Sequence, residues 1–239
     1  MKKLVFAGPS IHGLDLAPFT EIEFRAPAAA GDLLQAAHQG ARVIGLIDGV
    51  FEGAASVWHK EILAALTSNI PVYGAASMGA LRACECASFG MVGVGQIFED
   101  YASGRRSADA DVAVQHGPQA LGFMPLTLAL VDVEATLARL ADRLDSALLA
   151  SLDTAARAVP FRNRNWRTIC NQILDAPPNL PEDLENSAIS QKQTDAAELL
   201  SLLQNLTAPP TVNSAFTAQP FSQTDIFHRL DRKVRRRVR

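Results

Sequence analysis

The feature that most constrains the fold is an alternation of short apolar runs with helical periodicity over the first half of the chain. Continuous apolar runs occupy residues 4–7, 41–47 and 70–75, and such runs are typical of strands covered on both faces. Residues 21–25 alternate as a half-exposed strand would, and helical spacing fills residues 31–40. Strands and helices in this rhythm are joined by right-handed crossovers, so the sequence predicts an α/β fold with a mainly parallel sheet and flanking helices.

The ends of the predicted helices carry recognisable capping residues. Asp32 precedes the first helical run, and Ser56 precedes a second run that ends near Asn69. Both residue types accept hydrogen bonds from the free N–H groups of a first helical turn, so we expect both to be N-caps.

The pattern changes after Cys86 and becomes helical. Residues 89–95 are glycine-rich, but they follow a helix and lack the order of a dinucleotide-binding fingerprint, so we interpret them as a tight turn. Helical spacing recurs in residues 97–101, 126–149, 153–175 and 191–206. We therefore expect a core α/β domain at 1–120, an all-helical region at 121–206, and a linker with a basic tail at 207–239.

Composition excludes several classes of protein. The net charge is -3 and no apolar stretch is long enough to cross a bilayer, so neither nucleic acid nor a membrane is an expected partner. Three cysteines are too few and too unevenly placed for a disulfide framework, and the first residues do not form a signal-peptide core. These features predict a cytoplasmic protein, whose arginine-rich end we interpret as a solvated terminus.

The most informative single segment is residues 70–86, which is typical of a strand, a sharp turn and a helix. Ser77 lies on the turn, in an Ala75-x-Ser77-x-Gly79 arrangement that is a loose form of the G-x-S-x-G nucleophile elbow. Small neighbours permit the tight bend, and the following helix N-terminus favours an anion beside the hydroxyl. The alternative is a buried serine that only caps the helix.

Three chain segments should meet at the carboxyl edge of a parallel sheet, where such folds bind ligands. They are the turn at residues 8–10, Asp48 and Ser77, and His59 follows the Asp48 strand closely. Acyl transfer needs a nucleophile, a base, a group that orients the base and oxyanion donors. Ser77, His59, Asp48 and the Met78 N–H fit these roles, with His116 as a rival base. Alternatively, Asp48 only stabilises its turn and His59 only packs locally.

Metal and thiol chemistry are weaker readings of the sequence. Cys84 and Cys86 are two residues apart on a predicted helix, so they point to opposite sides and cannot share one ion. Asp109 and Asp111 would share a side with His116 if that segment were a strand, but a pair of exposed acids is the simpler interpretation. We therefore expect no metal and no cofactor.

The chain resembles the TfuA family in a series of blocks that occur in the expected order. The blocks are residues 44–51, 57–63, 74–83, 89–95 and 111–116. The resemblance covers roughly the first half of the chain. It implies a partnership with a YcaO-type enzyme, which activates peptide amides with ATP, and with a ThiS-like sulfur carrier that ends in a thiocarboxylate.

What the resemblance implies for function is release of sulfide from that thiocarboxylate, for backbone thioamidation of a ribosomally made precursor peptide. Ser77 would attack the thiocarboxylate carbon, and His59 or His116 would activate the water that hydrolyses the acyl-enzyme. Arg82 or Lys60 would hold the negative charge of the carrier tail. The expected substrate-binding residues are Met78, Gly79, Arg82, Lys60, Gly8, Ser10 and His116. Two alternatives remain: a non-catalytic docking or allosteric partner of YcaO, and an unrelated serine hydrolase of small esters.

Overall fold

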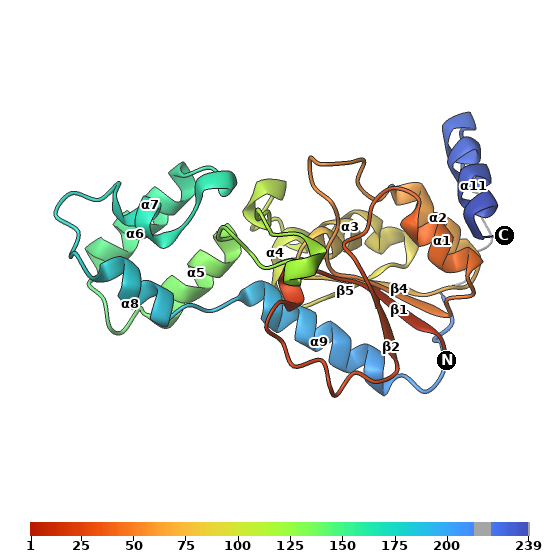
Figure 1. Cartoon of the computed structure of the whole chain (residues 1–239), viewed down its shortest axis with the longest axis horizontal. Helices are drawn as coiled ribbons and strands as arrows, with labels where there is room; N and C mark the ends of the chain where they lie inside the picture. The colour runs from red at the N-terminus through yellow and green to blue at the C-terminus, as the bar shows by residue number, and fades with distance from the viewer. Residues whose placement is uncertain (213–220, 239) are drawn as a thin grey trace.

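The computed structural model of the chain describes residues 1–212 and 221–238. Its first half is a five-stranded sheet in the order β2-β1-β3-β4-β5, and all four strand pairings are parallel (Figure 1). The strands are β1 (Lys3–Phe6), β2 (Ile22–Arg25), β3 (Val43–Leu46), β4 (Val72–Ala75) and β5 (Val92–Val94). The predicted α/β fold with a parallel sheet is confirmed.

Alternate strand residues feed two separate cores on the two faces of the sheet. On one face, residues such as Leu4 and Ile44 pack under α1 (Asp32–His38), α2 (His59–Thr67) and α3 (Met78–Cys86). On the other face, residues such as Val5 and Tyr73 pack against α9 (Gln191–Asn205). Figure 1 shows α9 running along the sheet on the side opposite α1 to α3. A helix from the far end of the sequence thus completes the α/β core.

The interpretation of residues 89–95 as a tight turn is wrong, because Val92–Val94 form the edge strand β5. Gly90 makes the turn before it with a φ of 97°. Gly93 lies against the Phe98 ring of α4 (Gln96–Ala102), and a Cβ there would overlap that ring. Glycine occurs in this strand because a neighbouring side chain approaches it closely. Propensity alone treats the same glycine as the end of a strand.

Both predicted N-caps are also wrong. The N-cap of α1 is Gly31 and that of α2 is Trp58. Glu61 takes over the capping, because its carboxylate accepts hydrogen bonds from the Trp58 N–H at 3.1 Å and the Gly31 N–H at 2.9 Å. Burial raises the pKa of this carboxyl against the lowering effect of those hydrogen bonds.

The second half forms a lobe with its own apolar core, at the left of Figure 1. Its helices are α5 (Leu130–Arg139), α6 (Ser146–Ala158), α7 (Trp166–Cys170) and α8 (Leu180–Asn186). The prediction of a helical second half is confirmed. Pro181 lies in the first turn of α8, where its missing N–H has no helical partner to lose.

The chain ends in a helix rather than in the solvated terminus expected from its arginines. Helix α11 (Asp225–Val238) packs on α1, and Phe227 and Val234 join Leu34 in a small core. Apolar residues at helical spacing between the charges give this segment one face to bury. Residues 213–220 of the expected linker lie outside the described residues. Within the described ranges, no helix is long and apolar enough to cross a membrane.

Candidate functional site

The carboxyl edge of the sheet brings together several of the predicted site residues. In the order β2-β1-β3-β4-β5, the connections from β1 and β3 leave in opposite directions, which creates a switch point between those two strands. The turn Pro9–Ile11 follows β1, Asp48 follows β3, and Ser77 follows the adjacent β4. The predicted convergence of these three segments is therefore present at this edge.

Asp48 binds the turn after β1. Its Oδ2 accepts the N–H groups of Gly8 at 2.8 Å and Ser10 at 3.0 Å, and its Oδ1 accepts the Ser10 hydroxyl at 2.7 Å. The carboxylate is only 1 % exposed, so these contacts replace its hydration. The N–H groups of Gly8 and Ser10 are therefore occupied by hydrogen bonds to Asp48. Asp48 forms no hydrogen bond with His59.

Ser77 follows a tight backbone turn. Ala76 has a φ of 65°, and the Ser77 N–H donates to the Ala75 carbonyl at 2.7 Å. A three-residue turn with positive φ at an alanine is strained, and such strain is concentrated at functional positions in proteins. The backbone of this segment confirms the predicted strand, turn and helix.

The polar groups at the turn are left without partners. The Ser77 hydroxyl makes no capping bond to α3, and neither it nor the Met78 N–H has a hydrogen-bond partner among the described residues. The next N–H, from Gly79, donates to the Ile47 carbonyl at 3.1 Å. A half-buried hydroxyl beside one free N–H is the pairing of nucleophile and oxyanion donor that the motif requires.

Glycine permits the close packing behind this turn. A Cβ on Gly79 would overlap the Leu46 carbonyl oxygen, and one on Gly74 would overlap the Gly79 carbonyl oxygen. The first turn of α3 therefore lies directly against the ends of β3 and β4. This contact fixes where the Ser77 hydroxyl stands above the sheet.

His59 lies in a separate polar cluster. Its Nε2 is 2.8 Å from Glu85 Oε2, which also accepts from Arg82 Nη1 at 2.6 Å. Arg82 in turn donates from Nε to the Val57 carbonyl at 3.0 Å. Glu85 is eight residues beyond Ser77, roughly 12 Å along the axis of α3 at 1.5 Å per residue. The structure thus joins His59 to Glu85 and Arg82, with no contact to Ser77.

The other two predicted side chains, Lys60 and His116, lie in different parts of the molecule. Lys60 donates to the Ser222 carbonyl at 2.7 Å, next to the C-terminal helix. His116 is bound through Nδ1 to the Gly117 carbonyl at 2.8 Å and stacks edge-on with Phe123. Phe123 reaches Gly8, where a Cβ would come within 3.2 Å of its ring. The loop that carries His116 therefore covers the turn after β1.

A cavity of about 350 Å³ opens beside that turn. Gly8, His12, Phe24 and Phe123 are among its lining residues. His12 Nδ1 is 3.1 Å from the Gly122 carbonyl oxygen, which ties the covering loop down. The cavity lies at the β1 end of the sheet edge and offers a mostly apolar recess.

The cysteines and acidic pairs considered in the sequence are occupied otherwise. Burial raises the pKa of the Cys86 thiol to about 11, so it is protonated at neutral pH. Asp109 and Asp111 lie on a 3-10 turn rather than a strand, and Asp111 pairs with Arg106 at 2.7 Å. Among the described residues, no three His, Cys, Asp or Glu side chains are placed to hold one metal ion.

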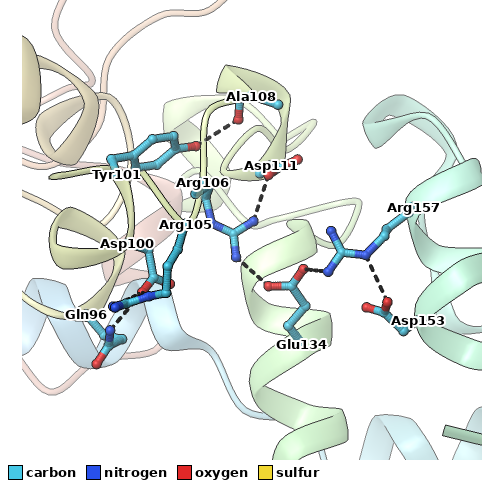
Figure 2. Close-up of polar contacts among 10 residues, drawn as sticks. All are labelled: Gln96, Asp100, Tyr101, Arg105, Arg106, Ala108, Asp111, Glu134, Asp153 and Arg157. Carbon is cyan, nitrogen blue, oxygen red and sulfur yellow. Dashed lines mark hydrogen bonds and ion pairs between the residues drawn. The ribbon is translucent and has the colours of Figure 1, made fainter. Parts of the chain in front are cut away.

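A polar cavity elsewhere escaped the sequence reasoning. It measures about 790 Å³ and includes Arg106, Glu134 and Arg157 in its walls. Figure 2 shows their guanidinium and carboxylate groups facing one another. The cavity walls come from separate segments of the chain, since Glu134 lies 28 residues after Arg106 and Arg157 lies 23 residues after Glu134. The arginines that recur along these segments were the only signal in the sequence for this cavity.

Comparison with protein families assigns the region that holds most of this site. Residues 48–165 match the family model of TfuA-like protein. The chain belongs to the TfuA-like family. The TfuA-like region contains Asp48, His59, Ser77, Arg82 and His116, whereas β1, β2 and α9 lie outside it. No curated protein matches the chain significantly.

Proposed function

We propose that this TfuA-like protein hydrolyses the C-terminal thiocarboxylate of a ThiS-like sulfur carrier and supplies the sulfide to a YcaO-type enzyme. The YcaO-type enzyme would then thioamidate the backbone of a precursor peptide. The observation that carries the proposal is the unpartnered Ser77 hydroxyl beside the unpartnered Met78 N–H, on a strained turn inside the TfuA-like region. Family membership supplies the substrate class, and the turn supplies a place for acyl transfer.

In this mechanism Ser77 Oγ attacks the thiocarboxylate carbon while its proton passes to a base. The Met78 N–H donates to the oxyanion that forms, together with the positive end of α3. As the tetrahedral intermediate collapses, the C–S bond breaks and the base returns its proton to the departing sulfur, which leaves as hydrosulfide while an ester remains on Ser77. A water molecule then attacks the ester, regenerates the hydroxyl and releases the carrier with an ordinary carboxylate.

His59 and His116 remain the two candidates for the base. His59 has the better-oriented ring, because Glu85 binds one of its nitrogens, but it needs the carrier or a partner to bring it toward Ser77. His116 lies on the loop that covers the turn after β1, at the same sheet edge. Asp48 serves as a positioning residue that holds this turn.

The carrier tail carries a negative charge, and Arg82, on the same helix that begins after Ser77, is the candidate to receive it. Its guanidinium already bridges Glu85 and the Val57 carbonyl, which fixes its direction beside α2. Gly8 and Gly79 contribute close packing, since a Cβ on either would overlap Pro27 or the Leu46 carbonyl, and this packing fixes the shape of the sheet edge that the tail would meet. Lys60 would meet the carrier outside this recess.

The test is sulfide release from a purified thiocarboxylated carrier, followed by intact mass of both proteins. We expect wild type to release sulfide and Ser77→Ala to lose at least about 100-fold in rate, as loss of a nucleophile removes the covalent route. Ser151→Ala, on the exposed side of α6, is the matched control. Equal rates for wild type and folded Ser77→Ala would overturn the role of Ser77.

A non-catalytic docking or allosteric role is the second candidate. It is favoured by one observation: among the described residues no base contacts Ser77. A docking subunit would bind the YcaO-type enzyme and the carrier without consuming the thiocarboxylate. Stimulation of thioamidation by both wild type and Ser77→Ala, with no sulfide released by either, would establish this role.

A further inference from the structure

The cavity of about 790 Å³ lies where the α/β half meets the helical lobe. One wall comes from the end of α4 and the loop after it, and the other from α5, α6 and the turn Phe161–Asn163. Small-molecule sites in proteins commonly measure about 300 to 1,000 Å³ and lie between structural units. Neither Ser77 nor the sheet edge contributes to this cavity.

Charged groups dominate the walls. The lining contains four arginines and three carboxylates, namely Arg105, Arg106, Arg157, Arg164, Asp100, Asp111 and Glu134. Arg105 pairs with Asp100 at 2.7 Å, Arg106 bridges Asp111 and Glu134, and Arg157 also binds Glu134 (Figure 2). Every lining carboxylate is therefore already engaged by one of three arginines.

Arg164 is the fourth arginine, and it has no carboxylate partner. It is only 4 % exposed, and its Nε donates to the Ala156 carbonyl at 3.0 Å. A longer contact of 3.5 Å joins Nη1 to the Leu128 carbonyl, while Nη2 has no acceptor among the described residues. Burial lowers the pKa of Arg164, against the opposing effect of Asp111 and Glu134. Arg164 thus lies near two carboxylates that Arg106 and Arg157 already bind, and it has no direct ion-pair partner of its own.

A second donor in the same wall is also unused. Arg106 Nε is buried and has no hydrogen-bond partner among the described residues. The cavity therefore holds one arginine more than it holds carboxylates, and its unused donors belong to guanidinium groups. A single carboxylate is the group whose charge and planar geometry match one free guanidinium.

Apart from Ser107, the rest of the lining is apolar. Leu130, Val159 and Phe161 lie on the helical side of the cavity. The Phe161 ring makes an edge contact with Phe51 of the α/β half, with ring centroids 5.8 Å apart, and this contact helps hold the two walls together. A ligand that fills this space needs an apolar body behind its charged group.

We propose that this cavity binds a small organic acid, with its carboxylate on Arg164 and its apolar body against Phe161. The site is separate from the Ser77 turn, and the inference stands whether or not the proposed hydrolysis does. Arg164 and Phe161 both belong to the helical wall, so the bound ligand would lie mainly against that wall and face Arg105 and Arg106 on the other. Arg157, which is half-exposed at the cavity wall, would contribute attraction during entry.

The experiment is calorimetric titration of the full chain with benzoate, with benzamide as the neutral isostere and acetate as the acid without a ring. We expect benzoate to bind at least about tenfold more tightly than benzamide, because only the acid forms charge-assisted hydrogen bonds with the guanidinium, and at least about tenfold more tightly than acetate, because only benzoate has a ring to pack on Phe161. Phe161→Leu should weaken benzoate binding, and Arg143→Gln, an exposed arginine of the same lobe, should not. Ser77→Ala should bind benzoate as wild type does.

Arg164→Lys tests the anchor while keeping a positive charge in place. We expect it to lose most of the preference for benzoate over benzamide, because an ammonium cannot pair with a carboxylate in the bidentate manner. If Arg164→Lys fails to fold, Phe161→Leu carries the test. Equal affinity for benzoate and benzamide, no binding at millimolar benzoate, or unchanged binding by Phe161→Leu would each overturn the proposal.

Discussion

At the scale of single residues, the site depends on glycines and on one strained alanine. Gly79 and Gly74 allow α3 to begin directly on the sheet, and Ala76 takes a positive φ so that Ser77 turns outward. These residues make no polar contact with a substrate in the proposal, yet they set the position of the hydroxyl. Substitutions at these positions therefore test the position of the hydroxyl without removing a group that would react.

Gly79→Ala should destabilise the fold, because its Cβ would overlap the Leu46 backbone carbonyl, which cannot move without shifting β3. We expect a loss of about 3 kcal/mol or more, at the upper end of overpacking effects. Gly53→Ala is the control, since its Cβ would meet only Val50 Cγ1 at 3.7 Å. Urea unfolding measures both, and equal midpoints would contradict the packing described at the turn.

Asp48 gives a prediction that separates positioning from direct catalysis. An asparagine can keep the accepted N–H bonds of Gly8 and Ser10 through its oxygen and donate to the Ser10 hydroxyl from its nitrogen. We therefore expect Asp48→Asn to retain most of the sulfide-releasing activity and Asp48→Ala to lose both activity and stability, by about 1 to 3 kcal/mol per orphaned donor. A loss of about 100-fold or more in a stable Asp48→Asn protein would instead restore Asp48 as the group that orients the base.

At the scale of elements, the continuous apolar runs and the alternating segment that forms β2 were predicted correctly, whereas elements whose burial depends on a distant partner were not. Strands β1, β3 and β4 coincide with continuous apolar runs, so the local sequence is enough to predict that they are buried. Strand β5 contains Gly93 and escaped prediction because its neighbour Phe98 supplies the bulk. Helix α11 escaped because its charges outnumber the apolar residues that it buries on α1.

The same division applies to the candidate site. The motif around Ser77 and the convergence of Asp48 with the turn after β1 were readable, since both follow from strand ends. The partners of His59 were not, because Glu85 reaches it from another helix. Pairings between side chains on different elements depend on helix packing, which local sequence does not encode.

Helix α11 should loosen in acid. His38 and Arg235 bind Asp231, and although burial raises the pKa of this carboxyl, their hydrogen bonds lower it below its ordinary 3.8 overall. A depressed pKa in the folded state stabilises the helix above the unfolded value, and this stabilisation is lost as pH falls through the folded value. We expect the hydrogen-exchange protection factors of α11, which correct for the slower intrinsic exchange in acid, to fall below about pH 4.

Asp231→Asn should reproduce this loosening at neutral pH, since the amide keeps the shape and removes the charge. Asp142→Asn, on an exposed turn of the helical lobe, is the matched control. Unchanged protection of α11 in Asp231→Asn would show that Phe227 and Val234 alone hold the helix.

At the scale of the whole molecule, the larger apolar cores are divided between two units, the α/β half and the helical lobe. Leu152 belongs to the core of the helical lobe, and Leu199 to the core between the sheet and α9. Each is fully buried. Replacing either by alanine should cost about 2 to 5 kcal/mol, through the lost burial and the cavity left behind.

We predict that the two substitutions destabilise different parts of the molecule. Leu152→Ala should increase hydrogen exchange in α5 to α8 and leave β1, β3 and β4 protected, whereas Leu199→Ala should expose the strands. Exchange resolved by mass spectrometry distinguishes the two patterns. Uniform loosening of the whole chain by Leu152→Ala would mean that the lobes unfold as one unit.

The position of α9 has a consequence for how the protein is made. The last strand is complete at Val94, but the helix that covers its second face begins only at Gln191. At about 5 to 20 residues per second, a ribosome needs roughly 5 to 20 s to synthesise the intervening segment. Throughout that time the nascent chain carries a finished sheet with one bare apolar face, which makes it a natural client for chaperones that bind during translation.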